Sequence, residues 1–513
     1  MVPWVCLESE ESGLAFRAVV PPTACRATRR IPVDIRFVQS LPEAISEAGV
    51  LGLAVGPGLS WYGDGGNHIA SLTPGFEDAA ARAGFDGKAG QSLTYPTGVS
   101  RPHTVVALGL GEDPGIETMR RAAGTLGRKV RKEVAVATTL TQAGPASPVV
   151  EGFLMSQYSY DRYLSEPDPA RTASLLLLGD ERAAERDAGA VVAEAVCLAR
   201  DLVNTPAREK APDAIRCQVE ELAGDTGIRL VVHDEAALIE GGFGGVLGVA
   251  VGSDRPPCML ELWYEPEGAT ALIAFVGKGI TFDSGGLSIK PAKAMETMKT
   301  DMSGAAAVIG AMQAIARLGI RVKVLGLTPL TDNMPGPMAT KPGDVLTTRN
   351  GKTIEVLNTD AEGRLILADA LALAAEYEPD LMVDLATLTG ACKVALGDKI
   401  AGVMGNDDAL VKRITTLGRD TGERMWHLPL PDDYRSQLKT PMADMRNIGG
   451  RWAGALTAAL LLEEFVGDVP WAHLDIAGPA RWVENENYQV KGGSGFGVRT
   501  LVALAADVAV NGV

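Results

Sequence analysis

Strand-like and helix-like segments alternate along almost the whole chain, and no other feature of the sequence constrains the fold more. Short apolar runs, for example at 50–55, 104–110 and 271–276, are typical of buried strands. The segments between them, such as 181–202 and 363–377, have the length and composition of helices. Because this order favours parallel crossovers, we predict an α/β fold with its chemistry at the carboxyl ends of strands.

The length of 513 residues exceeds that of a typical single domain, so we expect at least two domains. The clearest boundary is Asn204-Thr-Pro-Ala207, where a proline stops a long alanine-rich helix that Asp180 is placed to cap. The alternative is an ordinary surface helix within one domain. We predict four segments: a leader at 1–30, an N-terminal α/β domain at 31–180, a linker helix at 181–203 and a C-terminal domain at 204–513.

The composition, with 46% hydrophobic and 22% charged residues, is that of a soluble globular protein. The formal net charge of −16 disfavours a dedicated nucleic-acid binder, although a local basic patch remains open. The six cysteines contain no Cys-x-x-Cys pair, which fits a reducing cytoplasm better than a disulfide scaffold. No apolar stretch is long enough to span a membrane. Within the first 30 residues, the basic run Cys25-Arg-Ala-Thr-Arg-Arg30 is a candidate targeting segment, and the alternatives are a disordered leader or a start site placed too far upstream.

Common catalytic and nucleotide-binding motifs do not account for the chemistry. The glycines at 109, 111 and 115 follow a strand but miss the Gly-x-Gly-x-x-Gly spacing, so a structural turn explains them better. The sequence has no Walker loop, no His-Glu-x-x-His and no nucleophile elbow. The five histidines are scattered and are better explained as surface or core residues than as metal ligands.

Acidic residues concentrate in three other places. The glycine-rich segment 277–286 follows an apolar strand, a second acid stands in the first turns of a helix expected at 295–318, and two more open the helix at 363–377. Carboxylates gathered in this way repel one another unless a cation lies among them, and ligation without histidine suits magnesium, manganese or zinc. Taken singly, the acids at the helix start are also explained by a favourable interaction with the helix dipole, and Lys278 in the glycine-rich segment by a surface ion pair. The candidate ligands are Lys278, Asp283, Asp301, Asp360 and Glu362.

Two of these segments carry a specific resemblance. Asn358-Thr-Asp-Ala-Glu-Gly-Arg-Leu365 resembles the signature octapeptide of the leucine (cytosol) aminopeptidase family of dimetal exopeptidases, and 277–286 resembles that family's other metal loop. Thr300 and Ser303 depart from the family pattern, which bears on local packing or substrate preference. Residues 1–190 carry no motif of their own. The remaining matches, which extend the resemblance over about 195–505, lie at 201–207, 449–455, 473–480 and 495–499.

The resemblance implies a two-domain protein, with a smaller N-terminal α/β domain and a larger C-terminal α/β catalytic domain whose central mixed sheet is flanked by helices. It implies a cytoplasmic, metal-dependent leucyl aminopeptidase that releases N-terminal, apolar residues from peptides and assembles as a homohexamer. The implied cofactors are two divalent ions, manganese or zinc, with magnesium or cobalt as alternatives. By the same resemblance Lys278, Asp283, Asp301 and Glu362 hold the tighter ion, and Asp283, Asp360 and Glu362 the exchangeable one.

The resemblance also assigns the remaining roles. A metal-bridging hydroxide is the implied nucleophile, Lys290 stabilises the oxyanion and Arg364 holds a bicarbonate, whereas the simpler explanation of both cations is charge balance. Met298 resembles a pocket wall, although methionine is more often core. The alternative enzyme class is another dimetal hydrolase such as a phosphoesterase, but that class usually has histidine ligands and these segments contain none. A DNA-binding regulator with a dead site is disfavoured by the complete ligand set and the acidic charge, but not ruled out.

Overall fold

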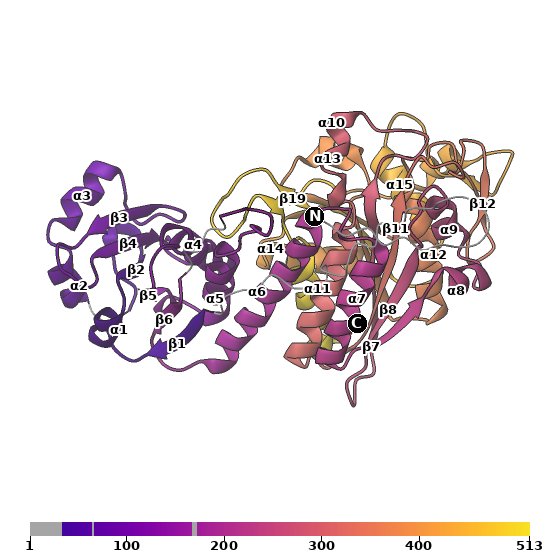
Figure 1. Ribbon diagram of the computed structural model, residues 1–513. Helices are drawn as coiled ribbons and strands as arrows, with labels where there is room; N and C mark the ends of the chain where they lie inside the picture. Colours follow the sequence, from indigo (N-terminus) through magenta and orange to yellow (C-terminus); the bar gives the residue numbers. More distant parts are fainter. Residues whose placement is uncertain (1–32, 64–65, 167–171) are drawn as a thin grey trace, which may run out of the picture.

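The structure, a computed structural model, describes residues 33–63, 66–166 and 172–513. It has two α/β parts that lie side by side, a smaller N-terminal one and a larger C-terminal one, each built around its own sheet (Figure 1). The predicted two-domain α/β class is confirmed. The predicted leader at 1–30 lies outside the described residues, and the four segment boundaries stay predictions.

The N-terminal sheet has the strand order β1-β6-β5-β2-β4-β3, and only β3 runs antiparallel to its neighbour. Its strands alternate apolar side chains between two cores, so helices cover both faces: α1, α2 and α3 on one, α4 and α5 on the other. The strands are β1 (Asp34–Val38), β2 (Val50–Val55), β3 (Ser92–Pro96), β4 (Thr104–Gly109), β5 (Ala135–Thr138) and β6 (Ser174–Leu178). The helices are α1 (Leu41–Glu47), α2 (Gly66–Leu72), α3 (Phe76–Ala83), α4 (Ile116–Lys129) and α5 (Ala146–Ser156), with 3-10 turns η1 (Pro57–Leu59) and η2 (Leu140–Gln142).

The long helix α6 (Ala183–Asn204) leads from this sheet into the second part (Figure 1). It ends where the Asn-Thr-Pro-Ala motif predicts, but it begins three residues later than Asp180, and Arg182 occupies the N-cap position without a side-chain cap. The expected N-cap is therefore wrong.

The C-terminal sheet is mixed and has the order β16-β15-β18-β14-β9-β11-β8-β7, with β10 beside β11. Its central strands β9 and β14 are buried on both faces, which explains why the sequence shows them as continuous apolar runs. The strands are β7 (Arg229–His233), β8 (Cys258–Tyr264), β9 (Leu272–Gly277), β10 (Gly279–Asp283), β11 (Lys323–Asn333), β14 (Leu381–Ala386), β15 (Ala401–Gly405), β16 (Met425–His427) and β18 (Trp471–Asp475). Two small sheets join β12 (Val345–Thr347), β13 (Thr353–Glu355) and β17 (Met445–Arg446), and β19 (Arg481–Trp482) and β20 (Gly492–Gly493).

Helices cover both faces of this sheet and enclose its two cores. The first face packs α6, α7 (Pro212–Thr226), α11 (Ser303–Leu318), α14 (Asp408–Asp420) and α16 (Val498–Asn511). The second packs α8 (Glu235–Glu240), α9 (Gly244–Ala250), α12 (Gly363–Glu376) and α15 (Gly454–Glu463). The shorter helices are α10 (Ala292–Met295), η3 (Met298–Thr300), α13 (Gly390–Leu396) and η4 (Asp432–Leu438). Among the described residues, none of the helices is both long and apolar enough to cross a membrane.

Two expectations about the acidic segments need correction. The segment 277–286 is not a loop throughout, because Gly279–Asp283 forms β10 and only 284–291 turns away. The helix expected at 295–318 is divided into the end of α10, the turn η3 and α11, so Asp301 stands before α11 and not within its first turns. Both breaks fall at the carboxyl end of the sheet, where side chains are turned toward one point.

Candidate metal centre

The acidic residues meet at the carboxyl ends of the central strands, the upper end of the larger part in Figure 1. Lys278 lies between β9 and β10, and Asp283 is the last residue of β10. Asp301 follows η3, and Glu362 is the N-cap residue of α12. Three separate segments, 278–283 and those that carry Asp301 and Glu362, therefore deliver their side chains to the same place, as expected for an α/β fold.

Lys278 is the centre of the inner part of this cluster. Its Nζ lies 2.8 Å from Asp301 Oδ2 and 2.8 Å from Glu362 Oε1, and it donates a hydrogen bond to the Thr387 carbonyl at 3.1 Å. Lys278, Asp301 and Glu362 are each at most 5% exposed. Gly363 makes this packing possible, because a Cβ there would stand 2.7 Å from the Lys278 Nζ.

Asp283 joins the inner part to a second lysine. Its Oδ1 accepts hydrogen bonds from the Gly285 amide and from Asn333 Nδ2, both at 2.8 Å. Its Oδ2 lies 2.8 Å from Lys290 Nζ, and the same ammonium also pairs with Asp360. Lys290 is 14% exposed and Asp360 33%, so this side of the cluster is the one that reaches solvent.

Burial and mutual repulsion oppose the charges of the carboxylates. Burial and the neighbouring Asp283 raise the pKa of Glu362 to about 8, although Lys278 acts in the opposite direction. Burial also raises the pKa of Asp301 to about 6 against the nearby ammonium. Burial disfavours the charged form of Lys278, but Asp301 and Glu362 outweigh it and raise the pKa of the amine. The group is one that additional positive charge would stabilise.

The donor set fits a divalent cation. One carboxylate oxygen each from Asp283, Asp301 and Glu362 lies within 4.8 Å of the others, and all three residues are buried. The buried Glu362 Oε2 has no hydrogen-bond partner among the described residues, so it remains available to a ligand. Oxygen donors with one amine and no histidine suit hard to borderline divalent ions.

Arg364 is the second residue of α12, in its first turn, where it is 7% exposed. Its Nη1 donates to the Asn447 carbonyl at 2.6 Å, and its Nε has no hydrogen-bond partner among the described residues. Burial lowers the pKa of the guanidinium to about 10, which still leaves it charged near neutral pH. A buried cation with a free donor is suited to holding a small anion.

Three neutral residues that position the carboxylates were not predicted from the sequence. Asn333 ends β11 in register with Asp283 and donates to it, and Thr387 follows β14 and donates to Asp301 Oδ1 at 2.7 Å. Asn447 accepts a hydrogen bond from the Leu357 amide at 2.9 Å and donates one to the Asn358 carbonyl at 2.7 Å. Only their position in the fold could have indicated these residues, because Asn333 ends β11 and Thr387 follows β14, and both strands are neighbours of β9.

Comparison with known proteins gives matches over both parts of the chain. The catalytic-domain model of the cytosol aminopeptidase family matches residues 197–502, and the model of the same family's N-terminal domain matches residues 70–167. The first match alone covers more than half of the chain.

Curated relatives and solved structures agree with the family models. A protein of Streptomyces coelicolor named "Probable cytosol aminopeptidase" is 43% identical over 501 residues, covering 90% of this chain and 96% of its own. The bottromycin maturation enzyme BotP matches with a TM-score of 0.81 and 36% identity over 90% of this chain and all of its own. A mutant of tomato leucine aminopeptidase matches with a TM-score of 0.83 and 30% identity, covering 94% of this chain and 98% of its own.

Proposed function

This chain belongs to the cytosol aminopeptidase family and is a metal-dependent aminopeptidase, and we propose that it releases N-terminal, apolar, leucine-like residues from peptides. The observation that carries the proposal is the buried cluster of Asp283, Asp301 and Glu362 around Lys278. The preference for apolar residues is supported by the name of the tomato relative and by Met298, which lies half-buried in η3 three residues before Asp301.

We assign two divalent ions to the cluster. Lys278, Asp283, Asp301 and Glu362 would hold the tighter ion, whereas Asp283, Asp360 and Glu362 would hold the more exchangeable one. The exposure of Asp360 supports this division, because an ion held at the solvent side exchanges more readily. We propose manganese or zinc, with magnesium or cobalt able to replace them. The relative BotP has been solved in complex with Mn, which supports manganese here.

When two such ions are bound, they supply a hydroxide nucleophile near neutral pH and polarise the scissile carbonyl. The chain's own residues then divide the remaining work. The ammonium of Lys290, on the solvent side of Asp283, is placed to stabilise the oxyanion that develops from the carbonyl. Arg364, with its free Nε, would hold a bicarbonate that carries the proton to the leaving amine.

We further propose that the chain acts on peptides in the cytoplasm, which the name shared by the curated relatives supports. We also propose that it assembles as a homohexamer, as its resemblance to the family implies. A role in DNA binding is not part of this proposal, because the net charge is −16.

The experiment is a release assay with a panel of aminoacyl anilides. Protein stripped by a chelator is compared with protein to which manganese, zinc, magnesium or cobalt has been returned, and the bound metal is counted by elemental analysis. We expect activity only in the metal-loaded samples and the fastest release for leucine. Full activity in protein proven to be metal-free would contradict the metal role, and faster release of charged residues would contradict the apolar preference alone.

A further inference from the structure

A cavity of about 1000 Å³ lies at the junction between the two parts of the molecule. Helix α4 of the N-terminal part lines one side, and α14, β16 and the segment 482–499 of the C-terminal part line the other. Figure 1 shows α14 and β19 on the side of the larger part that faces α4. None of the seven proposed site residues lines this cavity, so it is separate from the metal centre.

The lining of the cavity is basic, although the chain is acidic. It contains seven lysines and arginines but only three aspartates and glutamates, in a chain with a net charge of −16. Glu486 is shared by two of the cations, Arg121 at 2.9 Å and Lys399 at 2.8 Å. The side chains of Lys412 and Arg424, both exposed, have no carboxylate within ion-pair distance among the described residues. Positive potential focused in a concave site attracts anions.

A buried arginine extends this charge to the inner wall. Arg499 is only 7% exposed, and its guanidinium lies over the Tyr488 ring at 4.9 Å from the centroid. Its Nε is 3.4 Å from Glu423 Oε1, whereas its Nη1 has no hydrogen-bond partner among the described residues. A buried donor left without a partner is costly, so this group is available to a ligand that enters the cavity.

Flat apolar surfaces complete the lining. Trp426, on the edge strand β16, is 64% exposed, and Trp482 and Phe496 also line the cavity. An exposed indole in a cavity lined by cationic side chains is a combination that can bind a planar ring and an attached anion together. The volume is at the upper end of what small-molecule sites have.

We propose that this cavity binds a small aromatic anion of about the size of a mononucleotide. Lys412, Arg424 and Arg499 would hold its negative group, and Trp426 would stack on its ring. The ligand would contact both parts of the chain, because Glu117 and Arg121 of α4 line the same cavity. Its binding would therefore stabilise the native junction.

The test is calorimetric titration of the purified full chain with adenosine monophosphate and, separately, with N-acetyltryptophan. The first carries a phosphate and the second a carboxylate, so together they distinguish the two kinds of anion. Adenosine and inorganic phosphate are the controls for ring and charge alone. We expect one of the aromatic anions to bind at least about tenfold more tightly than either control, and to raise the melting temperature.

Two variants locate the binding. Arg424→Glu should weaken it by at least about tenfold, because an attraction becomes a repulsion. Arg321→Glu makes the same charge change at an exposed position outside the cavity and should leave it unchanged. Both variants should keep wild-type peptidase activity. The proposal would be overturned if neither aromatic anion bound, or if binding were unaffected by Arg424→Glu. It would also be overturned if a single-stranded oligonucleotide bound and neither small anion did.

Discussion

Lys278 and Lys290 face the same carboxylates, yet their surroundings give them different tasks. Lys278 is 3% exposed and enclosed by Asp301, Glu362 and the Thr387 carbonyl, so its amine is fixed inside the cluster. Lys290 is 14% exposed and stands between Asp283 and Asp360 at the open side. Once cations are bound to the carboxylates, they would replace the ammonium as their counter-charge, and the first position would then suit a neutral amine ligand. The second position suits a charged group that faces substrate.

Replacing Lys278 by arginine should therefore not be conservative. A guanidinium does not give up its proton and is larger than the amine, while Gly363 leaves no spare room beside Lys278. We expect Lys278→Arg to lose the tighter metal and most of its activity, as measured by elemental analysis and anilide hydrolysis. Lys293→Arg, at an exposed position in α10, is the matched control and should behave as wild type. Two metals per chain in Lys278→Arg would show that the amine is not a ligand.

Lys290 and Asp360 should fail in different ways. Lys290→Ala removes a cation from beside two carboxylates, so it should retain both metals and lose about 10²–10³-fold in turnover, which excess metal does not restore. Asp360→Asn keeps the shape but weakens the charge at the exchangeable site, and excess metal should restore part of its activity. Turnover and metal content measured across a metal titration separate the two. If Lys290→Ala proves metal-poor and recoverable, the roles are reversed.

The charged residues of the site could be identified from the sequence, whereas the neutral ones could not. Lys278, Asp283 and Glu362 lie in motifs whose composition is unusual enough to be noticed. Asn333 and Thr387 are single neutral residues that become important only through strand register and loop direction, which depend on long-range pairing. Sequence spacing alone carries no information about that pairing.

At the scale of elements, the apolar strands were predictable and the breaks around the site were not. β2, β9 and β14 are buried on both faces, so their sequences show the pattern directly. β10 contains Gly279 and polar residues because it passes the site, so its sequence resembles a loop more than a strand. The sequence predicts too early a start for α11, because alanine and methionine before Asp301 favour a helix that the turn η3 interrupts.

The end of α6 is held by an unusual arrangement of two lysines. The buried Lys210 amine donates to the carbonyls of Leu202 and Val203, each at 3.0 Å, and to the Lys299 carbonyl. Lys299 in turn donates to the Asn204 carbonyl at 2.6 Å. These bonds satisfy the last carbonyls of the helix and connect it to η3, the turn that precedes Asp301.

Lys210→Met should weaken this connection. Methionine fills a similar volume but leaves the buried carbonyls of Leu202 and Val203 and the half-buried Lys299 carbonyl without the amine donor, at a cost of roughly 1–3 kcal/mol for each group that stays unsatisfied. We expect a lower melting temperature and, because η3 is released, lower metal occupancy. Lys439→Met, at an exposed position, is the control. A melting temperature equal to that of the wild type would show that the bonds to α6 contribute no net stability.

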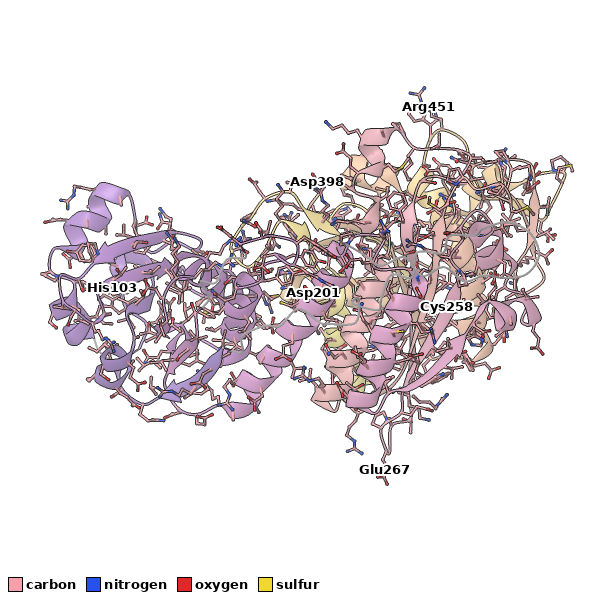
Figure 2. The ribbon with its side chains drawn as sticks, viewed as in Figure 1. His103, Asp201, Cys258, Glu267, Asp398 and Arg451 are labelled. Atoms are coloured by element: carbon pink, nitrogen blue, oxygen red, sulfur yellow. The ribbon has the colours of Figure 1, made fainter. Side chains whose placement is uncertain are left out.

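At the scale of the whole molecule, the packing of α6 accounts for how the parts are joined. Its buried side contributes to the C-terminal core, and Asp201 near its end accepts a hydrogen bond from Tyr158 at 2.9 Å (Figure 2 labels Asp201 between the two parts). Arg200 donates to the carbonyls of Met155 and Tyr488. Such cross-connections were not predictable, because they depend on how two separately folded sheets dock.

The homohexamer is the remaining prediction, and the structure changes which residues should carry it. From the sequence alone, the apolar, alanine-rich segment 453–462 is the candidate interface, but most of its side chains, which lie in α15, are buried in the core of the chain. Trp452, just before it, is instead 73% exposed, beside Arg451, which projects from the upper end of the molecule in Figure 2. An indole this exposed is unusual for a surface in contact with water and typical of an interface.

We therefore expect light scattering to give a mass near six times the 53.7 kDa chain, and Trp452→Glu to shift it toward smaller species. The substitution places a charge on apolar surface that assembly would bury, which costs free energy unless the charge finds a partner. Val134→Glu makes the same change at a residue of the N-terminal part that is 74% exposed, and it should leave the mass unaltered. A wild-type mass equal to one chain at micromolar concentration would refute the assembly. An unchanged hexamer in Trp452→Glu would leave the assembly standing but move the interface elsewhere.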